Sequence, residues 1–233
     1  MANEGGLRIG SFAGAAIVVD PTILILALFV LANSGEGGLL GAFSFLAALV
    51  VAVLLHEFGH AGVAALLKLP SKRIVLTFFG GHVDFAWPPK SRWQDIVVSA
   101  AGPIANLLVY FIVVVLAASL NDLPNVAYLF MAQLAEVSLL LGVFNLLPGF
   151  PLDGGRILRA FLNYFMSLDR ARLIAGAIGL LIALALVGYS VLQGLWWNVM
   201  VGLFLGLGAW SEARSANAAL KRGTPSEPSA SAG

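Results

Sequence analysis

The feature that most constrains this chain is an apolar segment that carries ionisable side chains. Residues 39–67 are almost entirely apolar, yet they contain His56, Glu57 and His60. An apolar stretch of about 20 residues is long enough to cross the hydrocarbon core of a bilayer as a helix. Ionisable side chains are costly at that depth and usually mark a functional site. The segment therefore predicts a membrane-spanning helix that holds functional residues.

Further apolar segments extend this interpretation to the whole chain. We predict six helices, at residues 21–33, 39–67, 93–120, 126–147, 173–192 and 195–210. The 233 residues are 60% hydrophobic and only 11% charged, whereas a soluble domain has about 25% charged residues. The net charge of +1 argues against a nucleic-acid-binding protein, and a chain without cysteine forms no disulfide or thiolate metal site. The predicted fold class is an all-α polytopic membrane protein with six transmembrane helices.

The positions of the basic residues predict the orientation in the membrane. All 13 Lys and Arg residues lie before the first helix, after the second, after the fourth or after the last. The other connections carry only Glu36 and Asp122 as charged residues. Cytoplasmic loops are enriched in Lys and Arg. We therefore expect a multi-pass protein of the cell (inner or plasma) membrane with both termini in the cytoplasm.

Two segments have the composition of strands instead of helices. Residues 73–89 are β-branched and aromatic, with Gly80 and Gly81 at a turn, which predicts a β-hairpin. Residues 7–19 are also strand-like and are expected to pair with this hairpin on the cytoplasmic side. Strands at membrane depth must be buried in protein or line a watery cavity. We therefore add a small cytoplasmic-side β-sheet to the predicted fold.

The pattern His-Glu-x-x-His at residues 56–60 has the spacing of a metal-binding helix. His56 and His60 are four residues apart, so both imidazoles lie on one helix face. They can bind one Zn²⁺ ion while Glu57 handles a proton of a water molecule. A catalytic zinc site uses three protein ligands, so a third is required. The candidates near the membrane are His82, Asp20, Asp84, Asp95, Glu136 and Asp153.

Asp153 is the most suitable of these candidates because the chain around it is irregular. It lies in the stretch "NLLPGFPLDGGR", at the predicted cytoplasmic end of the fourth helix. Pro148 and Pro151 interrupt that helix, and the two glycines after Asp153 permit a sharp turn. Broken backbone at membrane depth is tolerated where it shapes a cavity. Asp153 would complete a zinc site of two histidines and one carboxylate.

Together these motifs resemble the site-2 protease family of intramembrane zinc metalloproteases. The chain has "HEFGH" at 56–60 and "NLLPGFPLDGG" at 145–155, two predicted helices later. It also has the family patterns "FGG" at 79–81 and "AGPIAN" at 101–106. The resemblance covers most of the chain between residues 7 and 212, with the motifs in the expected order. Many members of the family carry PDZ or CBS domains, and we expect neither in these 233 residues.

The resemblance implies a role for each residue of the site. His56, His60 and Asp153 would be the ligands of one Zn²⁺ ion per chain, and Glu57 the catalytic acid/base. Asn145, eight residues before Asp153, would be catalytic by binding the substrate carbonyl or oxyanion. Three more residues are expected to bind substrate or to pack around the site, namely Asn106, Gly80 and Gly81. For Asn106, with Gly102 and Pro103, we favour close helix packing over direct catalysis.

The resemblance also implies a domain organisation and a class of substrate. We expect one intramembrane metalloprotease domain over residues 1–212, with a catalytic core at about 39–167, and a disordered cytoplasmic tail over 213–233. The family cleaves transmembrane segments, so single-span or membrane-tethered proteins and the bilayer itself are the expected partners. The active-site opening would face the cytoplasm. A glycine series at 202, 206 and 208 predicts close helix packing, with a homodimer as one outcome.

Two other functions use some of the same residues. A zinc-binding membrane transporter would need an exit path and usually repeated halves, and we identify neither in the sequence. Coordination alone would also leave Glu57 without a purpose. A non-catalytic membrane scaffold would need neither Glu57 nor the ligands. We assign His82 to the surface of the hairpin. Glu136 receives no functional interpretation. Neither does Asp20, a position at which many relatives have His.

Overall fold

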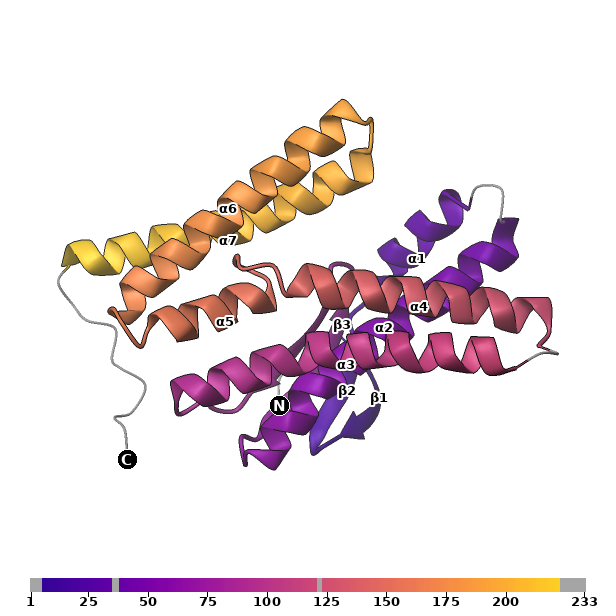
Figure 1. The fold of residues 1–233 in the computed structure, drawn as a ribbon, viewed down its shortest axis with the longest axis horizontal. Helices are drawn as coiled ribbons and strands as arrows, with labels where there is room; N and C mark the ends of the chain where they lie inside the picture. The colour runs from indigo at the N-terminus through magenta and orange to yellow at the C-terminus, as the bar shows by residue number, and fades with distance from the viewer. Residues whose placement is uncertain (1–5, 35–37, 121–122, 223–233) are drawn as a thin grey trace. The chain divides into compact units, whose positions relative to one another are not determined.

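The structure is a computed structural model, and it describes residues 6–34, 38–120 and 123–222 (Figure 1). Its elements follow in this order: β1 (Leu7–Phe12), β2 (Ala15–Val19), α1 (Ile23–Ala32), α2 (Gly38–Leu66), β3 (Ser71–Thr77), β4 (Gly80–Phe85), α3 (Arg92–Ser119), α4 (Asn125–Asn145), α5 (Asp153–Leu162), α6 (Leu168–Leu192) and α7 (Trp196–Arg222). The chain divides into two compact units. Of the described residues, the first unit contains 6–34, 38–88, 101–120 and 123–143, and the second contains 89–100 and 144–222.

Four helices of the described chain, α2, α3, α4 and α6, are long and apolar enough to cross a membrane. The prediction of a mainly helical membrane protein with a small sheet is therefore confirmed. The other two predicted spans are less regular. The helix α1 is apolar but only 10 residues long, and α7 loses its apolar character after Trp210, where charged residues begin.

The first unit contains a four-stranded sheet in the order β1-β2-β3-β4. Its β1–β2 and β3–β4 pairs are antiparallel, whereas β2 and β3 are parallel. The turn between β1 and β2 consists of Ala13 and Gly14, both with positive φ, as the common two-residue hairpin turns require. The two predicted strand segments thus form one sheet, although α1 and α2 separate them in the chain.

This sheet packs against the C-terminal half of α2. Ile74 of β3 and Ala15 of β2 are fully buried in a cluster with Ala61 of α2. The ring of Phe12 stacks on the ring of Phe58, with centroids 4.2 Å apart. The small side chain of Ala61 permits a close approach of strand to helix. The sheet is therefore fixed beside the part of α2 that contains the His-Glu-x-x-His motif.

The second unit is built on α5 and the neighbouring pair α6 and α7 (Figure 1). Leu152, Ala183 and Leu205 form a buried apolar cluster. The glycines of α7 that predicted close packing contact their own chain: a Cβ at Gly202 would lie 2.7 Å from a Val187 methyl group. One at Gly208 would lie 3.2 Å from the Pro151 ring. A homodimer through these glycines remains only a prediction.

The structure differs from the predicted elements at two polar helical segments, α5 and the C-terminal end of α7. The amphipathic α5 was not predicted, because it is short and begins with glycines that rarely start a sequence-based helix assignment. The tail predicted to be disordered from residue 213 is helical up to Arg222. Helix-forming Ala, Leu, Lys and Arg residues and the Arg172–Glu212 ion pair, with Nε and Oε1 2.6 Å apart, stabilise this end of α7. Residues 223–233, Glu36 and Asp122 lie outside the described chain.

Candidate metal centre

His56 and His60 of α2 bring two imidazole nitrogens to one point. Their Nε2 atoms are 3.1 Å apart, and the rings meet edge to face at 81°. Two nitrogen ligands of one tetrahedral zinc ion, each bonded at about 2.0–2.1 Å, lie about 3.3–3.4 Å apart. The side chains are only 7% and 4% exposed. The pair therefore fits a shared zinc ion, and it also suits a hydrogen bond between the rings when one Nε2 carries a proton.

Glu57 is buried beside this pair and lies against the sheet. It is 4% exposed, although it stands in a helix of membrane length. A Cβ on Gly81 of β4 would lie 2.6 Å from Glu57 Cγ and 2.7 Å from its Oε1 atom. The carboxyl group therefore fits only because residue 81 has no side chain. Gly80 is a glycine for a different reason. Its φ of 121° is a conformation that other residues rarely adopt, whereas a Cβ there would meet nothing within 4 Å.

Gly102 of α3 lies against both imidazoles. A Cβ at this position would overlap His60 Nε2 and lie 2.7 Å from His56 Nε2. Room beside both nitrogens therefore depends on the glycine of the "AGPIAN" motif. The sequence interpretation assigned Gly102 only to close helix packing. One signal in the sequence could have identified Gly102, because it lies in "AGPIAN", which is a pattern of the same family as "HEFGH".

Asn106 lies one turn after Gly102 on α3 and is fully buried. In the described part of the chain, neither its amide nitrogen nor its amide oxygen has a hydrogen-bond partner. A buried amide without partners is destabilising by about 1–3 kcal/mol. The burial agrees with a packing residue and the unsatisfied amide with a substrate-binding one, so both roles remain predictions.

In the second unit, Asp153 is the first residue of α5 and is buried. The N-terminus of a helix favours a carboxylate there. The next two residues allow the chain to fold back tightly. A Cβ on Gly154 would overlap the carbonyl oxygens of Leu146 and Leu147, and one on Gly155 would overlap the backbone at Gly149. The break predicted from the prolines is thus a compact turn that carries Asp153.

Asn145, the last residue of α4, is partly buried at the start of this turn. The structure therefore ends α4 at the asparagine that the family resemblance singled out. Its function as a donor to substrate remains a prediction.

Other candidates for the third ligand form hydrogen bonds or ion pairs away from the histidines or are exposed. His82 is exposed on β4 and lies 3.7 Å from Asp84, which accepts a hydrogen bond from Arg73 Nε at 2.5 Å. Asp20 accepts a hydrogen bond from the Thr22 amide at 2.8 Å. Hydrogen bonds from the Thr22 side chain and backbone lower the pKa of the Asp20 carboxyl. Glu136 is exposed on α4. These positions do not resemble zinc ligands.

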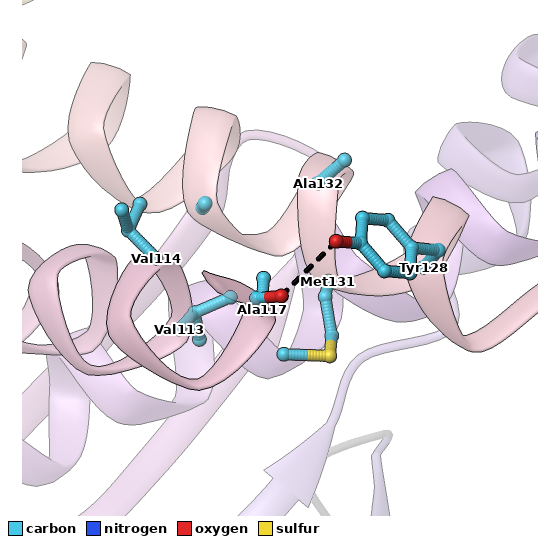
Figure 2. A pocket seen from close by; sticks show the side chains of 7 residues that line it. Val113, Val114, Ala117, Tyr128, Met131 and Ala132 are labelled. Carbon is cyan, nitrogen blue, oxygen red and sulfur yellow. Dashed lines mark hydrogen bonds between the residues drawn. The ribbon is translucent and has the colours of Figure 1, made fainter. Parts of the chain in front are cut away.

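A separate pocket in the first unit lies between α3 and α4 (Figure 2). Its lining consists of Val113, Val114, Ala117, Tyr128, Met131, Ala132 and Ala135. The Tyr128 hydroxyl donates a hydrogen bond to the Ala117 carbonyl at 3.0 Å (Figure 2). No histidine or carboxylate lines the pocket, so it is not a candidate for the chemistry above.

Comparison with known proteins agrees with the chemistry of these residues. The sequence profile described as peptidase family M50 matches residues 44–127 and 119–186. Protein sll0528 of Synechocystis is 31% identical over an alignment of 233 positions, which covers 91% of this chain and 61% of that protein. Zinc metalloprotease MJ0392 of Methanocaldococcus jannaschii is 34% identical over 166 residues, 71% of this chain and 48% of that protein. This chain thus spans roughly half to three-fifths of the length of these relatives.

A solved structure leads to the same family. The site-2 protease from Methanocaldococcus jannaschii has a TM-score of 0.71 and 28% sequence identity, covering 90% of this chain and 95% of that one. The family profile matches more than half of the chain. The chain therefore belongs to peptidase family M50, the site-2 protease family that its motifs resemble.

Proposed function

We propose that this protein is an intramembrane zinc endopeptidase that cleaves transmembrane segments of membrane proteins. The observation that carries the proposal is the pair of buried imidazole nitrogens, 3.1 Å apart, on a helix of membrane length. The buried Glu57 beside them favours a protease over a protein that only binds metal, because coordination by two imidazoles does not require a glutamate. The name of the relative MJ0392, a zinc metalloprotease, supports the same reaction.

We assign His56, His60 and Asp153 as the ligands of one zinc ion per chain. Each of these side chains offers one ligand atom and each is buried. Two neutral imidazoles and one carboxylate form a known catalytic ligand set, which leaves a coordination position for water or substrate. Zinc held by them would lower the pKa of a water molecule and polarise the scissile carbonyl. Gly102 keeps the space beside both imidazole nitrogens clear of side-chain atoms.

Glu57 is the proposed acid/base. Its carboxylate would accept a proton from the attacking water and later deliver it to the leaving amine. Burial against Gly81 limits the positions that this carboxylate can adopt, which supports a role in directed proton transfer. Asn145 would donate a hydrogen bond to the developing oxyanion, an interaction worth about 3–4 kcal/mol in comparable enzymes.

We further propose that all six predicted helices enter the membrane and that both termini are cytoplasmic. The pairing of β2 with β3 joins the chain before α1 to the chain after α2. The helix α1 therefore leads from the sheet toward the start of α2. Its 10 residues span about 15 Å, half of a hydrocarbon core of about 30 Å. This length suits a sheet within membrane depth, where it packs beside Phe58 of α2.

The proposed substrates are single-span or membrane-tethered proteins. A substrate helix must unwind locally before its peptide bond can be attacked, since helical carbonyls are already hydrogen-bonded. The strand order puts β4 at an edge of the sheet. An extended substrate segment could add to such an edge through backbone hydrogen bonds, beside the glycine that lies on Glu57.

The decisive experiment replaces Glu57 by Gln in the full-length protein. We expect cleavage of a reconstituted single-span substrate to be lost while the zinc content stays at one ion per chain, because the amide cannot accept the proton but the ligands remain. The matched control is Glu136→Gln, which changes an exposed glutamate and should cleave normally. Equal cleavage by the Glu57 variant would refute the protease assignment, whereas zinc flux without cleavage would support a transporter.

A further inference from the structure

One guanidinium group in the second unit faces two carboxylates from different helices. Arg156 follows Asp153 by three residues, so both lie on one face of α5. Arg156 Nη1 is 3.7 Å from Asp153 Oδ1. Arg156 Nη2 is 3.7 Å from Oδ1 of Asp95, in the first turn of α3. Arg156 therefore connects the carboxylate of Asp153 to α3.

Asp95 is itself held from a second direction. Arg159 Nη2 donates a hydrogen bond to Asp95 Oδ2, and the Arg159 guanidinium lies 5.5 Å from the centroid of the Phe150 ring. The Asp95 side chain is 13% exposed and that of Arg156 is 26% exposed. At such burial, removing one partner leaves a poorly solvated charge. The two aspartates and two arginines balance each other in formal charge.

We propose that Arg156 and Asp95 are positioning residues of the zinc centre. The ion pair between Arg156 and Oδ1 of Asp153 fixes the orientation of this carboxylate on α5. Asp95 fixes Arg156 and offsets its positive charge, which by itself would oppose the binding of a cation. This inference rests on the proposed role of Asp153 as a zinc ligand. Outer partners of this kind commonly orient metal ligands, and losing one weakens metal binding about 10–100-fold.

The two residues act differently, and this difference can be measured. In Asp95→Asn, the charge of Arg156 is no longer offset, so zinc affinity should fall about 10–100-fold. In Arg156→Gln, orientation is lost but a repelling charge is also removed, so the loss should be smaller. The double variant should bind zinc more tightly than Asp95→Asn alone. Such non-additivity identifies groups that act through each other.

The measurement is the zinc dissociation constant of the full-length protein in detergent, by competition with a chelator. Circular dichroism of the zinc-free variants checks that each is folded. The matched control is Glu212→Gln, which breaks the ion pair with Arg172 in the same unit. This control should lower thermal stability and leave zinc affinity unchanged.

Two outcomes distinguish this inference from the proposed function. Unchanged zinc affinity in Asp95→Asn, with weakened affinity in Asp153→Ala, would overturn the positioning role and leave the ligand set intact. Unchanged affinity in Asp153→Ala would overturn both. If Asp95→Asn does not fold, the zinc affinity of Arg156→Lys tests the positioning role instead. This variant keeps the charge but cannot face both carboxylates with a planar group, so affinity must fall several-fold, and unchanged affinity refutes the inference.

Discussion

At the scale of single residues, the proposed zinc centre depends on two glycines, Gly102 and Gly81, which have no side chain. Gly102 adjoins the nitrogens of both histidines, and Gly81 adjoins the carboxyl group of Glu57. Both come from outside α2, one from α3 and one from β4. A methyl group at Gly102 would meet the histidines, whereas one at Gly81 would meet Glu57. The two glycines therefore allow the proposed metal binding and the proposed proton transfer to be disturbed separately.

We predict that two glycine substitutions differ in their effect on zinc binding. Gly102→Ala should reduce zinc binding, since its methyl group would overlap His60 Nε2. Gly81→Ala should retain zinc and lose cleavage, because it displaces only the Glu57 carboxyl group. Zinc content by atomic absorption and cleavage of a reconstituted substrate measure the two effects.

Gly41→Ala is the control for this pair, because a Cβ there would meet nothing within 4 Å on the same helix as the histidines. It should retain both zinc and cleavage. Full zinc content in Gly102→Ala would show that the space beside the imidazoles is not needed for the metal.

The sequence predicted the chemistry of the site better than the space around it. The four-residue spacing of His56 and His60 follows from helix geometry, so their convergence could be predicted. Gly81 was selected through the "FGG" motif. The contact of Gly102 with the imidazoles was not predicted, because it depends on where α3 crosses α2; only its place in the "AGPIAN" motif linked this glycine to the site.

At the scale of elements, the turn between α4 and α5 is held by the helix behind it. A Cβ on Gly179 of α6 would overlap the Phe150 carbonyl oxygen and lie 2.8 Å from the Phe150 nitrogen. The Phe150 amide donates a hydrogen bond to the Ala175 carbonyl, 3.2 Å away. The turn that leads to Asp153 therefore rests on the backbone of α6.

We predict that Gly179→Ala destabilises the protein by about 1–3 kcal/mol, as overpacking of a buried contact does. The thermal midpoint should fall by about 2–4 °C for each kcal/mol, in a fluorescence or calorimetric scan. Gly188→Ala on the same helix is the control, since a Cβ there would meet nothing within 4 Å. An equal midpoint in the two variants would contradict the support of the turn by α6.

The elements divide into those that sequence could identify and those that it could not. Apolar length located α2, α3, α4 and α6 to within a few residues, because lipid requires it. The β-branched and aromatic composition and the turn at Gly80 and Gly81 located the strands. The amphipathic α5 and the polar end of α7 were missed, since neither has the apolar length used to recognise the other helices.

At the scale of the whole molecule, the number of spans determines which side of the membrane each connection faces. If α7 crosses the membrane, its C-terminal end lies opposite the α6–α7 connection. If it does not, both lie on the same side. The protein contains no cysteine, so single introduced cysteines can report their side of the membrane without background.

We predict that Gln193→Cys is labelled by an impermeant maleimide in intact cells, whereas Lys90→Cys and Asn217→Cys are labelled only after permeabilisation. All three positions are exposed in the structure. Labelling of both Gln193→Cys and Asn217→Cys from outside would exclude a membrane crossing by α7. Labelling of Lys90→Cys from outside would reverse the proposed orientation.

The parallel pairing of β2 with β3 has a consequence for biosynthesis. One strand leaves the ribosome before the first two hydrophobic segments, and the other leaves after them. The edge of β2 that pairs with β3 therefore has no partner until α1, α2 and the chain up to Thr77 have been synthesised. A nascent chain stopped before Ser71 lacks this partner, so the sheet beside Glu57 is completed only after both hydrophobic segments have left the ribosome.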